Sequence, residues 1–190
     1  MSSDFEKYLS CHEKYLNFLG KKVLDYGCGQ GTITSLIKIR SRNSSVYGYD
    51  LDKFKIKRAK KKERYGLSFI SSLENIKGDK FESIFSGFVL HESGFELINE
   101  MNSFLTPKGY LIILDHDKKG ISFENFKRCL TEQDKKEHKE LSDKEIWKQH
   151  TKYELKDCVS FAEKNGFKTI QTYSHTDLDF GAYLWIGKSC

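Results

Sequence analysis

The sequence predicts an α/β protein built on a mainly parallel sheet, and three observations support this. Short apolar segments alternate with amphipathic segments over residues 23–115, which is the pattern of parallel strands joined by crossover helices. Three alternating glycines directly follow the first apolar segment and precede a helical one. Strand-like segments at 167–173 and 180–186 are separated by only six residues. Because a parallel crossover needs a longer connection, the last strand is predicted to be antiparallel.

The predicted elements follow one another in chain order. Apolar residues at offsets of three and four predict an amphipathic helix over residues 4–19. Strands are then expected at 23–26, 45–50, 67–71, 81–87 and 110–114, with helices at 32–39, 53–64 and 92–104. A further helix over 153–165 is followed by Gly166, a residue typical of helix C-termini. We find no repeat or linker and expect a single domain over residues 1–190.

Residues 117–150 interrupt this alternation. They are charged and poor in β-branched residues, and they are predicted to form helix and loop. They follow the fifth predicted strand, so they should lie over the carboxyl edge of the sheet, where open α/β folds bind their ligands. We therefore expect the segment at about 117–150 to be a substrate cap.

The composition indicates a soluble globular protein. The chain has 190 residues, of which 38% are hydrophobic, and a mean hydropathy of -0.60. No apolar run approaches the roughly 18–20 residues of a membrane span, and the N-terminus lacks the apolar core of a signal peptide. The five cysteines are scattered without a C-x-x-C pair, which favours neither a zinc knuckle nor a disulfide framework. We expect a cytoplasmic protein.

The net charge of +5 is unevenly distributed, because eight lysines and arginines fall within residues 53–64. Such a segment could contact nucleic acid. It also fits the solvated face of a helix, with Phe54, Ile56 and Ala59 on the inward or ligand-facing side. We favour the helix interpretation, since aromatic residues do not interleave with the charges as a single-strand binder requires. Nucleic acid is therefore not the expected partner.

The segment Val23-Leu24-Asp25-Tyr26-Gly27-Cys28-Gly29-Gln30-Gly31 is the most specific motif of the chain. Its glycines allow backbone to lie directly against a ligand, and the following helix N-terminus offers free N–H groups. The spacing G-x-G-x-G departs from the G-x-G-x-x-G of dinucleotide sites. With the preceding strand and acid, it resembles the first motif of the class I S-adenosylmethionine (SAM)-dependent methyltransferases.

This resemblance covers about residues 5–188 and implies a doubly wound, Rossmann-like, seven-stranded sheet with strand order 3-2-1-4-5-7-6. It also implies that SAM is the cofactor. Asp50 stands 21 residues beyond Gly29, where an acid accepts hydrogen bonds from ribose hydroxyls. The residues expected to bind the cofactor are Asp25, Gly27, Cys28, Gly29, Gly31, Asp50, Leu51, Ser72, Leu73 and Ser86.

Individual roles within this set also follow from the resemblance. Asp25 is expected to act on the methionine ammonium, Leu51 to lie on the adenine face, and Ser86 to flank the methionine end. Ser72 occupies the position where the family usually has an aspartate for the adenine amino group. Tyr8, His12 or Tyr15 of the N-terminal helix could close over the cofactor or belong to the core.

The acceptor side is indicated by the residues after strands four and five. The chain lacks the Asn/Asp-Pro-Pro-Tyr/Phe sequence that resembles adenine or glutamine methyltransferases. Its Leu90-His91 and the aspartate of strand five resemble small-molecule methyltransferases of the ubiquinone/menaquinone-biosynthesis type. His91 and His116 are candidate general bases, because imidazole titrates near neutrality. His150 and Tyr153 are candidate substrate contacts.

We expect no metal site. The candidate ligands are His91, His116, His138 and His150 with Asp115 and Asp117, but they are far apart in sequence and no close ligand pair is present.

Three functions are compatible with these features. The favoured one is a SAM-dependent methyltransferase acting on a small molecule. The basic segment leaves open a methyltransferase acting on RNA or protein, and the missing adenine-binding acid leaves open a non-catalytic SAM-binding protein. The sequence does not indicate an oligomeric state.

Overall fold

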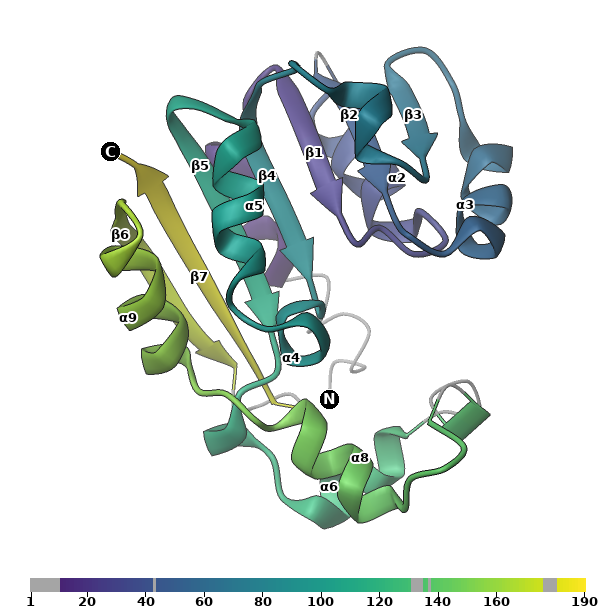
Figure 1. Cartoon of the computed structure of the whole chain (residues 1–190), viewed down its shortest axis with the longest axis vertical. Helices are drawn as coiled ribbons and strands as arrows, with labels where there is room; N and C mark the ends of the chain where they lie inside the picture. Colours follow the sequence, from purple (N-terminus) through teal and green to yellow (C-terminus); the bar gives the residue numbers. More distant parts are fainter. Residues whose placement is uncertain (1–10, 43, 131–134, 137, 176–180) are drawn as a thin grey trace.

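The computed structural model describes residues 11–42, 44–130, 135–136, 138–175 and 181–190. Its centre is a seven-stranded sheet with the order β3-β2-β1-β4-β5-β7-β6 (Figure 1). β7 pairs antiparallel with both of its neighbours, and the other pairs are parallel. The predicted fold class and strand order are confirmed. The strands are β1 (Lys22–Tyr26), β2 (Ser45–Tyr49), β3 (Leu67–Ile70), β4 (Phe81–Gly87), β5 (Leu105–Asp115), β6 (Phe167–His175) and β7 (Ala182–Ser189).

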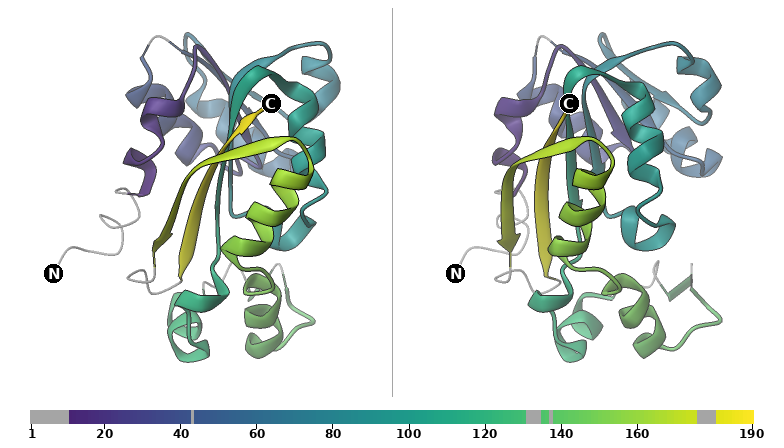
Figure 2. Two further views of the ribbon diagram at one scale, coloured as in Figure 1. Left: turned by 90° about the vertical axis from the view of Figure 1, so that its left-hand side faces the viewer. Right: turned by 60° about the vertical axis from the view of Figure 1, so that its left-hand side comes forward.

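Helices cover both faces of this sheet (Figure 2). One face packs against the N-terminal segment, α2 (Thr32–Arg40) and α3 (Lys53–Ala59), through a core that includes Tyr15, Ile37 and Phe85. The other face packs against α4 (Leu90–Ser93), α5 (Leu97–Phe104) and α9 (Leu155–Lys164), around a core that includes Trp185. The alternation of side chains along each strand supplies both cores.

Two predicted elements differ from the structure. The helix expected over 92–104 is divided into α4 and α5, because Gly94 adopts a φ of 88° that no helix contains. The strand expected over 110–114 begins earlier, at Leu105, and pairs with β4 on both sides of an irregularity. Pro107, Lys108 and Gly109 therefore lie inside a bulged strand and not in a preceding turn.

The N-terminal helix can be compared with the prediction only from residue 11, since residues 1–10, and Tyr8 with them, lie outside the described part. Residues 11–13 are helical, a turn follows, and a 3-10 helix, η1 (Leu16–Phe18), ends the segment. The helix expected over 53–64 becomes α3 followed by a second 3-10 turn, η2 (Lys60–Lys62).

The segment after β5 folds over the carboxyl end of the parallel strands, where the cap was expected (Figure 1). Its described residues include a 3-10 turn, η4 (Lys118–Gly120), and the helices α6 (Phe123–Cys129) and α8 (Asp143–His150). Ile121, Phe126 and Ile146 form a small apolar cluster that is separate from the two main cores. A capping box between Ser142 and Glu145 fixes the start of α8.

Two surface features bear on partners. The basic residues of 53–64 are mostly exposed, and Lys62 uses its ammonium to bond the carbonyl of Gln30 at 2.6 Å. The segment is therefore an exposed basic face, and one of its lysines contacts the glycine loop. Among the described helices, none has the length and apolar content needed to cross a membrane.

Candidate active site

The three motif glycines all have positive φ angles of 82°, 54° and 75°, but they serve different purposes. A Cβ on Gly27 would lie 2.3 Å from Val89, and a Cβ on Gly31 would lie 2.5 Å from the Phe69 ring. Both glycines are therefore required by packing as well as by φ. A Cβ on Gly29 would meet nothing within 4 Å. The backbone at Gly29 consequently faces open space, as expected where a ligand approaches.

Asp50 joins this loop to the end of β2. One carboxylate oxygen accepts a hydrogen bond from the Gly29 N–H at 2.8 Å, and the other accepts one from the Asp52 N–H at 2.8 Å. Asp52 in turn caps α3 through its own side chain. A carboxylate has about four acceptor positions, so Asp50 keeps capacity for the hydroxyl groups of a ribose.

Asp25 lies at the end of β1 and is fully buried. The Thr34 hydroxyl of α2 donates to its carboxylate at 2.6 Å. Burial raises the pKa of Asp25 to about 7, the Thr34 hydrogen bond opposes this, and the nearby Asp50 adds to it. Its observed contact therefore ties the strand to the helix that follows the glycines.

The remaining predicted cofactor residues are divided between exposed and internal positions. Leu51 is 78% exposed and lies next to Asp50, and Phe54, expected on the inward or ligand-facing side, is 82% exposed. Cys28 is buried, which raises the pKa of its thiol. Ser72 caps the 3-10 turn η3 (Leu73–Ile76) by accepting from the Glu74 N–H, and Leu73 packs against the core. Exposed apolar side chains beside Asp50 form a surface that an adenine ring could cover.

Ser86 lies near the end of β4, where the cofactor and acceptor sides meet. Its side chain is buried, and its hydroxyl has no hydrogen-bond partner among the described residues. Because a buried hydroxyl without a partner costs free energy, this position suits contact with a polar ligand atom.

His91 and Asp115 form a buried pair at the tips of β4 and β5. The His91 Nδ1 atom lies 2.6 Å from Asp115 Oδ1, and the His91 backbone N–H donates to Oδ2 at 3.1 Å. The His116 N–H donates to Oδ1 at 2.7 Å. Burial alone would raise the pKa of Asp115, but His91 and His116 hold it below its usual value. An ionised carboxylate only accepts hydrogen bonds, so the His91 proton sits on Nδ1 and Nε2 faces away from Asp115.

His116 and His150 complete a cluster with His91. The His91 ring centroid lies 4.9 Å from that of His116 and 4.5 Å from that of His150. The distance from His150 Nδ1 to His116 Nε2 is 3.3 Å. His91 and His150 are buried and His116 is half-buried. The fold thus brings both candidate bases and one candidate substrate contact to a single place beneath the cap.

Tyr153 does not join this cluster as closely. Its ring lies against that of Phe95 in a tilted arrangement with a centroid distance of 4.2 Å, and its hydroxyl lies near Gly94, in the link between α4 and α5. Asp117 is also occupied elsewhere, because it caps η4 and accepts a hydrogen bond from Ser174. His138 stands outside the cluster, with its ring centroid 5.7 Å from that of His150.

The N-terminal aromatics belong to the core. His12 Nδ1 lies 2.5 Å from the Tyr15 hydroxyl, and Tyr15 stacks on Phe85 with a centroid distance of 4.9 Å. Burial lowers the pKa of His12 to about 4. The sequence left open whether these residues close over the cofactor or belong to the core, and the burial of His12 and Tyr15 matches a place in the core.

Phe88 is a site residue that sequence reasoning missed. It directly follows β4, has a φ of 59°, and places its ring centroid 4.9 Å from that of His116. Such a conformation costs free energy for a bulky residue and is found preferentially at functional sites. No local pattern signals it, because the conformation is imposed by the hydrogen bond of its N–H to the Leu114 carbonyl.

The chain is similar to known proteins both in sequence and in fold. The family described as "Methyltransferase domain" matches residues 18–172. Among proteins of curated function, no sequence matches this chain significantly. Magnesium protoporphyrin IX methyltransferase (ChlM) from Synechocystis, solved with bound SAM, superposes with a TM-score of 0.67 at 17% identity, covering 98% of this chain and 80% of its own.

Two further structures show the same fold. The plantazolicin methyltransferase BpumL, solved with a pentazolic desmethylPZN analog and S-adenosylhomocysteine (SAH), has a TM-score of 0.69 at 14% identity, with coverage of 98% and 86%. The N-methyltransferase NodS from Bradyrhizobium japonicum has a TM-score of 0.67 at 14% identity, with coverage of 99% and 98%.

Proposed function

The chain belongs to the methyltransferase-domain family and is a class I SAM-dependent methyltransferase, and we propose that it methylates a small molecule at the histidine cluster. SAM is its cofactor and supplies a methyl group already activated on a sulfonium. The protein must therefore hold this cofactor, place the acceptor in line with it and exclude water.

The single observation that carries the cofactor half of the proposal is the bridge from Asp50 to the glycine loop. Its carboxylate holds the Gly29 backbone in place and keeps free lone pairs at the edge of the sheet. We propose that Asp50 accepts from the ribose hydroxyls, that Gly27, Gly29 and Gly31 form the backbone cradle, and that Leu51 covers the adenine.

Other cofactor contacts follow from position along the same edge. We propose that Cys28, Ser72 and Leu73 line the site and that Ser86 flanks the methionine end with its buried hydroxyl. Asp25 acts from beneath the loop, where its contact with Thr34 fixes the start of α2.

The acceptor half rests on the pair of His91 and Asp115. Asp115 fixes the orientation and tautomer of His91, which leaves Nε2 directed away from the carboxylate. An imidazole held this way can receive a proton from an acceptor hydroxyl or amine, and His116 beside it is the second candidate. We propose that His150 on the cap contacts the acceptor and that Tyr153, whose ring packs against Phe95, limits the site.

A small acceptor is supported by the cap. α6 and α8 lie over the carboxyl end of the strands and carry their own apolar cluster, which restricts access to this edge. The structural neighbours include enzymes named for magnesium protoporphyrin IX and for plantazolicin. Methyl transfer to RNA or protein stays an alternative outcome of the experiment below.

Calorimetry with SAM and SAH tests the cofactor half. We expect Asp50→Ala to weaken SAM binding by about 100-fold, since hydrogen bonds to a charged group contribute roughly 1.5–3 kcal/mol. Asp52→Ala is the matched control, because Asp52 caps α3 next to the same loop and should leave affinity nearly unchanged. Failure of the wild-type protein to bind either ligand at millimolar concentration would reject the proposal.

Radiolabelled SAM tests the acceptor class. The enzyme is incubated separately with the low-molecular-weight, RNA and protein fractions of a cell extract. We expect the label to enter the low-molecular-weight fraction. Label confined to RNA or protein would reject the small-molecule proposal and leave the cofactor half intact.

A further inference from the structure

The three histidines beneath the cap are arranged as ligands for one ion. His91, His116 and His150 each place a ring nitrogen within 4.8 Å of the other two. We propose that they bind a divalent transition-metal ion, with Zn²⁺ as the reference, on the acceptor side of the site. The inference rests on the proposed function for its catalytic meaning and replaces the general-base role of His91 and His116 when the ion is bound, because a coordinated ring nitrogen cannot also accept a proton. Metal binding itself can be tested without SAM.

The spacing of the ring nitrogens fits this use. Zinc–nitrogen bonds are about 2.1 Å long, so tetrahedral ligand atoms lie about 3.4 Å apart. The distance from His150 Nδ1 to His116 Nε2 is already 3.3 Å. The widest separation in the cluster, up to 4.8 Å, closes with a small rotation of the side chain. Imidazole is a preferred ligand of zinc, copper, iron and nickel, whereas magnesium and calcium prefer oxygen.

Asp115 gives His91 the orientation of a ligand. The carboxylate accepts the Nδ1 hydrogen at 2.6 Å and also accepts the backbone N–H groups of His91 and His116. Metal-bound histidines commonly donate their second ring N–H to a carboxylate in this way, which fixes the ring and the tautomer. The Nε2 atom of His91 is then the one directed at the ion.

The ligands come from parts of the chain that only the fold brings together. His91 opens α4 after β4, His116 follows β5, and His150 ends α8 of the cap. Their separation of 25 and 34 residues is why the sequence led us to expect no metal. Because His150 belongs to the cap, an ion at this site would hold the cap against the sheet edge.

The fourth coordination position faces the acceptor. Glu92 Oε1 lies 3.8 Å from His91 Nε2, and the Glu92 side chain is half exposed, so it can reach the ion or swing away. Phe88 and Phe126 flank His116 and His150 with their rings and limit the access of water. Three protein ligands with one position open is the arrangement of catalytic zinc sites. We therefore assign the open position to an oxygen or nitrogen atom of the acceptor.

The test measures metal binding directly. Tag-free protein is stripped with a chelator and titrated with Zn²⁺ by calorimetry, and then with Co²⁺, whose visible spectrum reports coordination geometry. We expect one ion per chain and a tetrahedral Co²⁺ spectrum. His150→Ala should weaken Zn²⁺ binding by about 100-fold or more, and Asp115→Asn by roughly 10–100-fold through loss of orientation.

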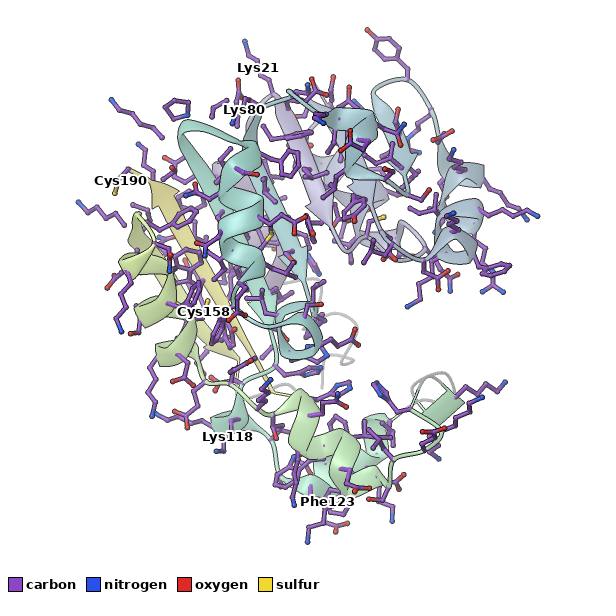
Figure 3. The ribbon with its side chains drawn as sticks, in the orientation of Figure 1. Lys21, Lys80, Lys118, Phe123, Cys158 and Cys190 are labelled. Atoms are coloured by element: carbon purple, nitrogen blue, oxygen red, sulfur yellow. The ribbon has the colours of Figure 1, made fainter. Side chains whose placement is uncertain are left out.

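Two controls separate the cluster from adventitious binding. His138→Ala removes a histidine whose ring centroid lies 5.7 Å from that of His150, and it should lower the Zn²⁺ affinity much less than His150→Ala does. Cys190→Ser removes the exposed thiol, which lies at the end of β7 away from the cap helix that carries Phe123 (Figure 3). It should leave the affinity unchanged.

The outcomes distinguish this inference from the proposed function. Unchanged stoichiometry and affinity in His150→Ala, or an octahedral Co²⁺ spectrum that the variant does not alter, would overturn the metal site. His91→Ala risks leaving Asp115 buried without its partner, so His150→Ala on the peripheral helix is the decisive variant. If the metal-free protein still binds SAM, the proposed SAM site is supported independently of the outcome of the Zn²⁺ titration.

Discussion

The two halves of the candidate site are built in different ways. The nucleotide half, which consists of the loop at 25–31 and Asp50, uses backbone groups and three glycines from one short segment plus a single carboxylate. The histidine half, which consists of His91, Asp115, His116 and His150, uses side chains from three places in the fold. The first half is determined by local conformation, and the second by how distant elements pack.

Because of this difference, substitutions in the nucleotide half and in the histidine half should have different effects. A change in the nucleotide half alters a strained backbone that also supports the core, so binding and stability should respond together. A change in the histidine half removes a polar side chain at the rim of the sheet, so chemistry should respond while cofactor binding is kept. Four experiments test this contrast.

His91→Ala should have the largest effect. General acid–base catalysis contributes roughly 10²–10⁴-fold, and turnover should fall by that order whether His91 receives a proton or orients the acceptor as a ligand. SAM affinity should stay within about twofold. Steady-state kinetics on the labelled acceptor fraction, with calorimetry for SAM, measures both quantities, and urea unfolding checks that the variant stays folded although Asp115 loses its buried partner. Unchanged turnover would transfer the chemistry to His116 or to proximity alone.

Gly31→Ala should destabilise the fold by about 3 kcal/mol. Its Cβ would lie 2.5 Å from Phe69, and the φ of 75° adds strain for any residue with a side chain. Gly29→Ala is the matched control, because its Cβ meets no neighbour and only the φ strain of about 1 kcal/mol applies. Urea unfolding of both variants measures the difference, and equal losses of stability would contradict the assigned roles.

Asp25→Asn should remove a pH dependence of stability. The folded protein keeps the Asp25 proton up to about pH 7, whereas an unfolded aspartate releases it near 3.8. The free energy of unfolding therefore falls as pH rises between these values, by about 1.4 kcal/mol per pH unit, and levels off above pH 7. In urea unfolding at pH 5–8, the variant should lack this slope. Parallel profiles for the two proteins would show that Asp25 does not titrate in this range.

Ser142→Ala should have the smallest effect of the four substitutions, a loss of stability confined to α8. Loss of an N-cap side chain costs about 1 kcal/mol. This raises the equilibrium constant for local opening of α8 roughly fivefold and should not affect the nucleotide half. Hydrogen exchange of the α8 amides measures the opening, and SAM affinity should not change. Ser122→Ala, which removes the corresponding cap of α6, is a useful companion. A loss of SAM affinity in either variant would show that the two halves are coupled.

The same contrast explains how far the sequence could be interpreted. The strands and the glycine loop could be predicted from local pattern, because apolar periodicity and positive φ are set within a few residues, whereas the strand order was implied by the resemblance to class I methyltransferases. The division of the helix at Gly94 and the early start of β5 were missed, since a lone glycine is compatible with either a helix or a break. His91, His116 and His150 were each singled out, but their meeting depends on where α8 packs. Nothing local specifies that position.

The bridge made by Asp50 has a consequence for the rate at which the cofactor binds. Its hydrogen bonds to Gly29 and Asp52 are formed within the protein and therefore favour one conformation of the loop. The conformational entropy of this segment is thus lost during folding and not during association. The association rate constant of SAM should then be limited by diffusional encounter and not by rearrangement of the protein. Differences in affinity among loop variants should arise mainly from differences in the dissociation rate constant.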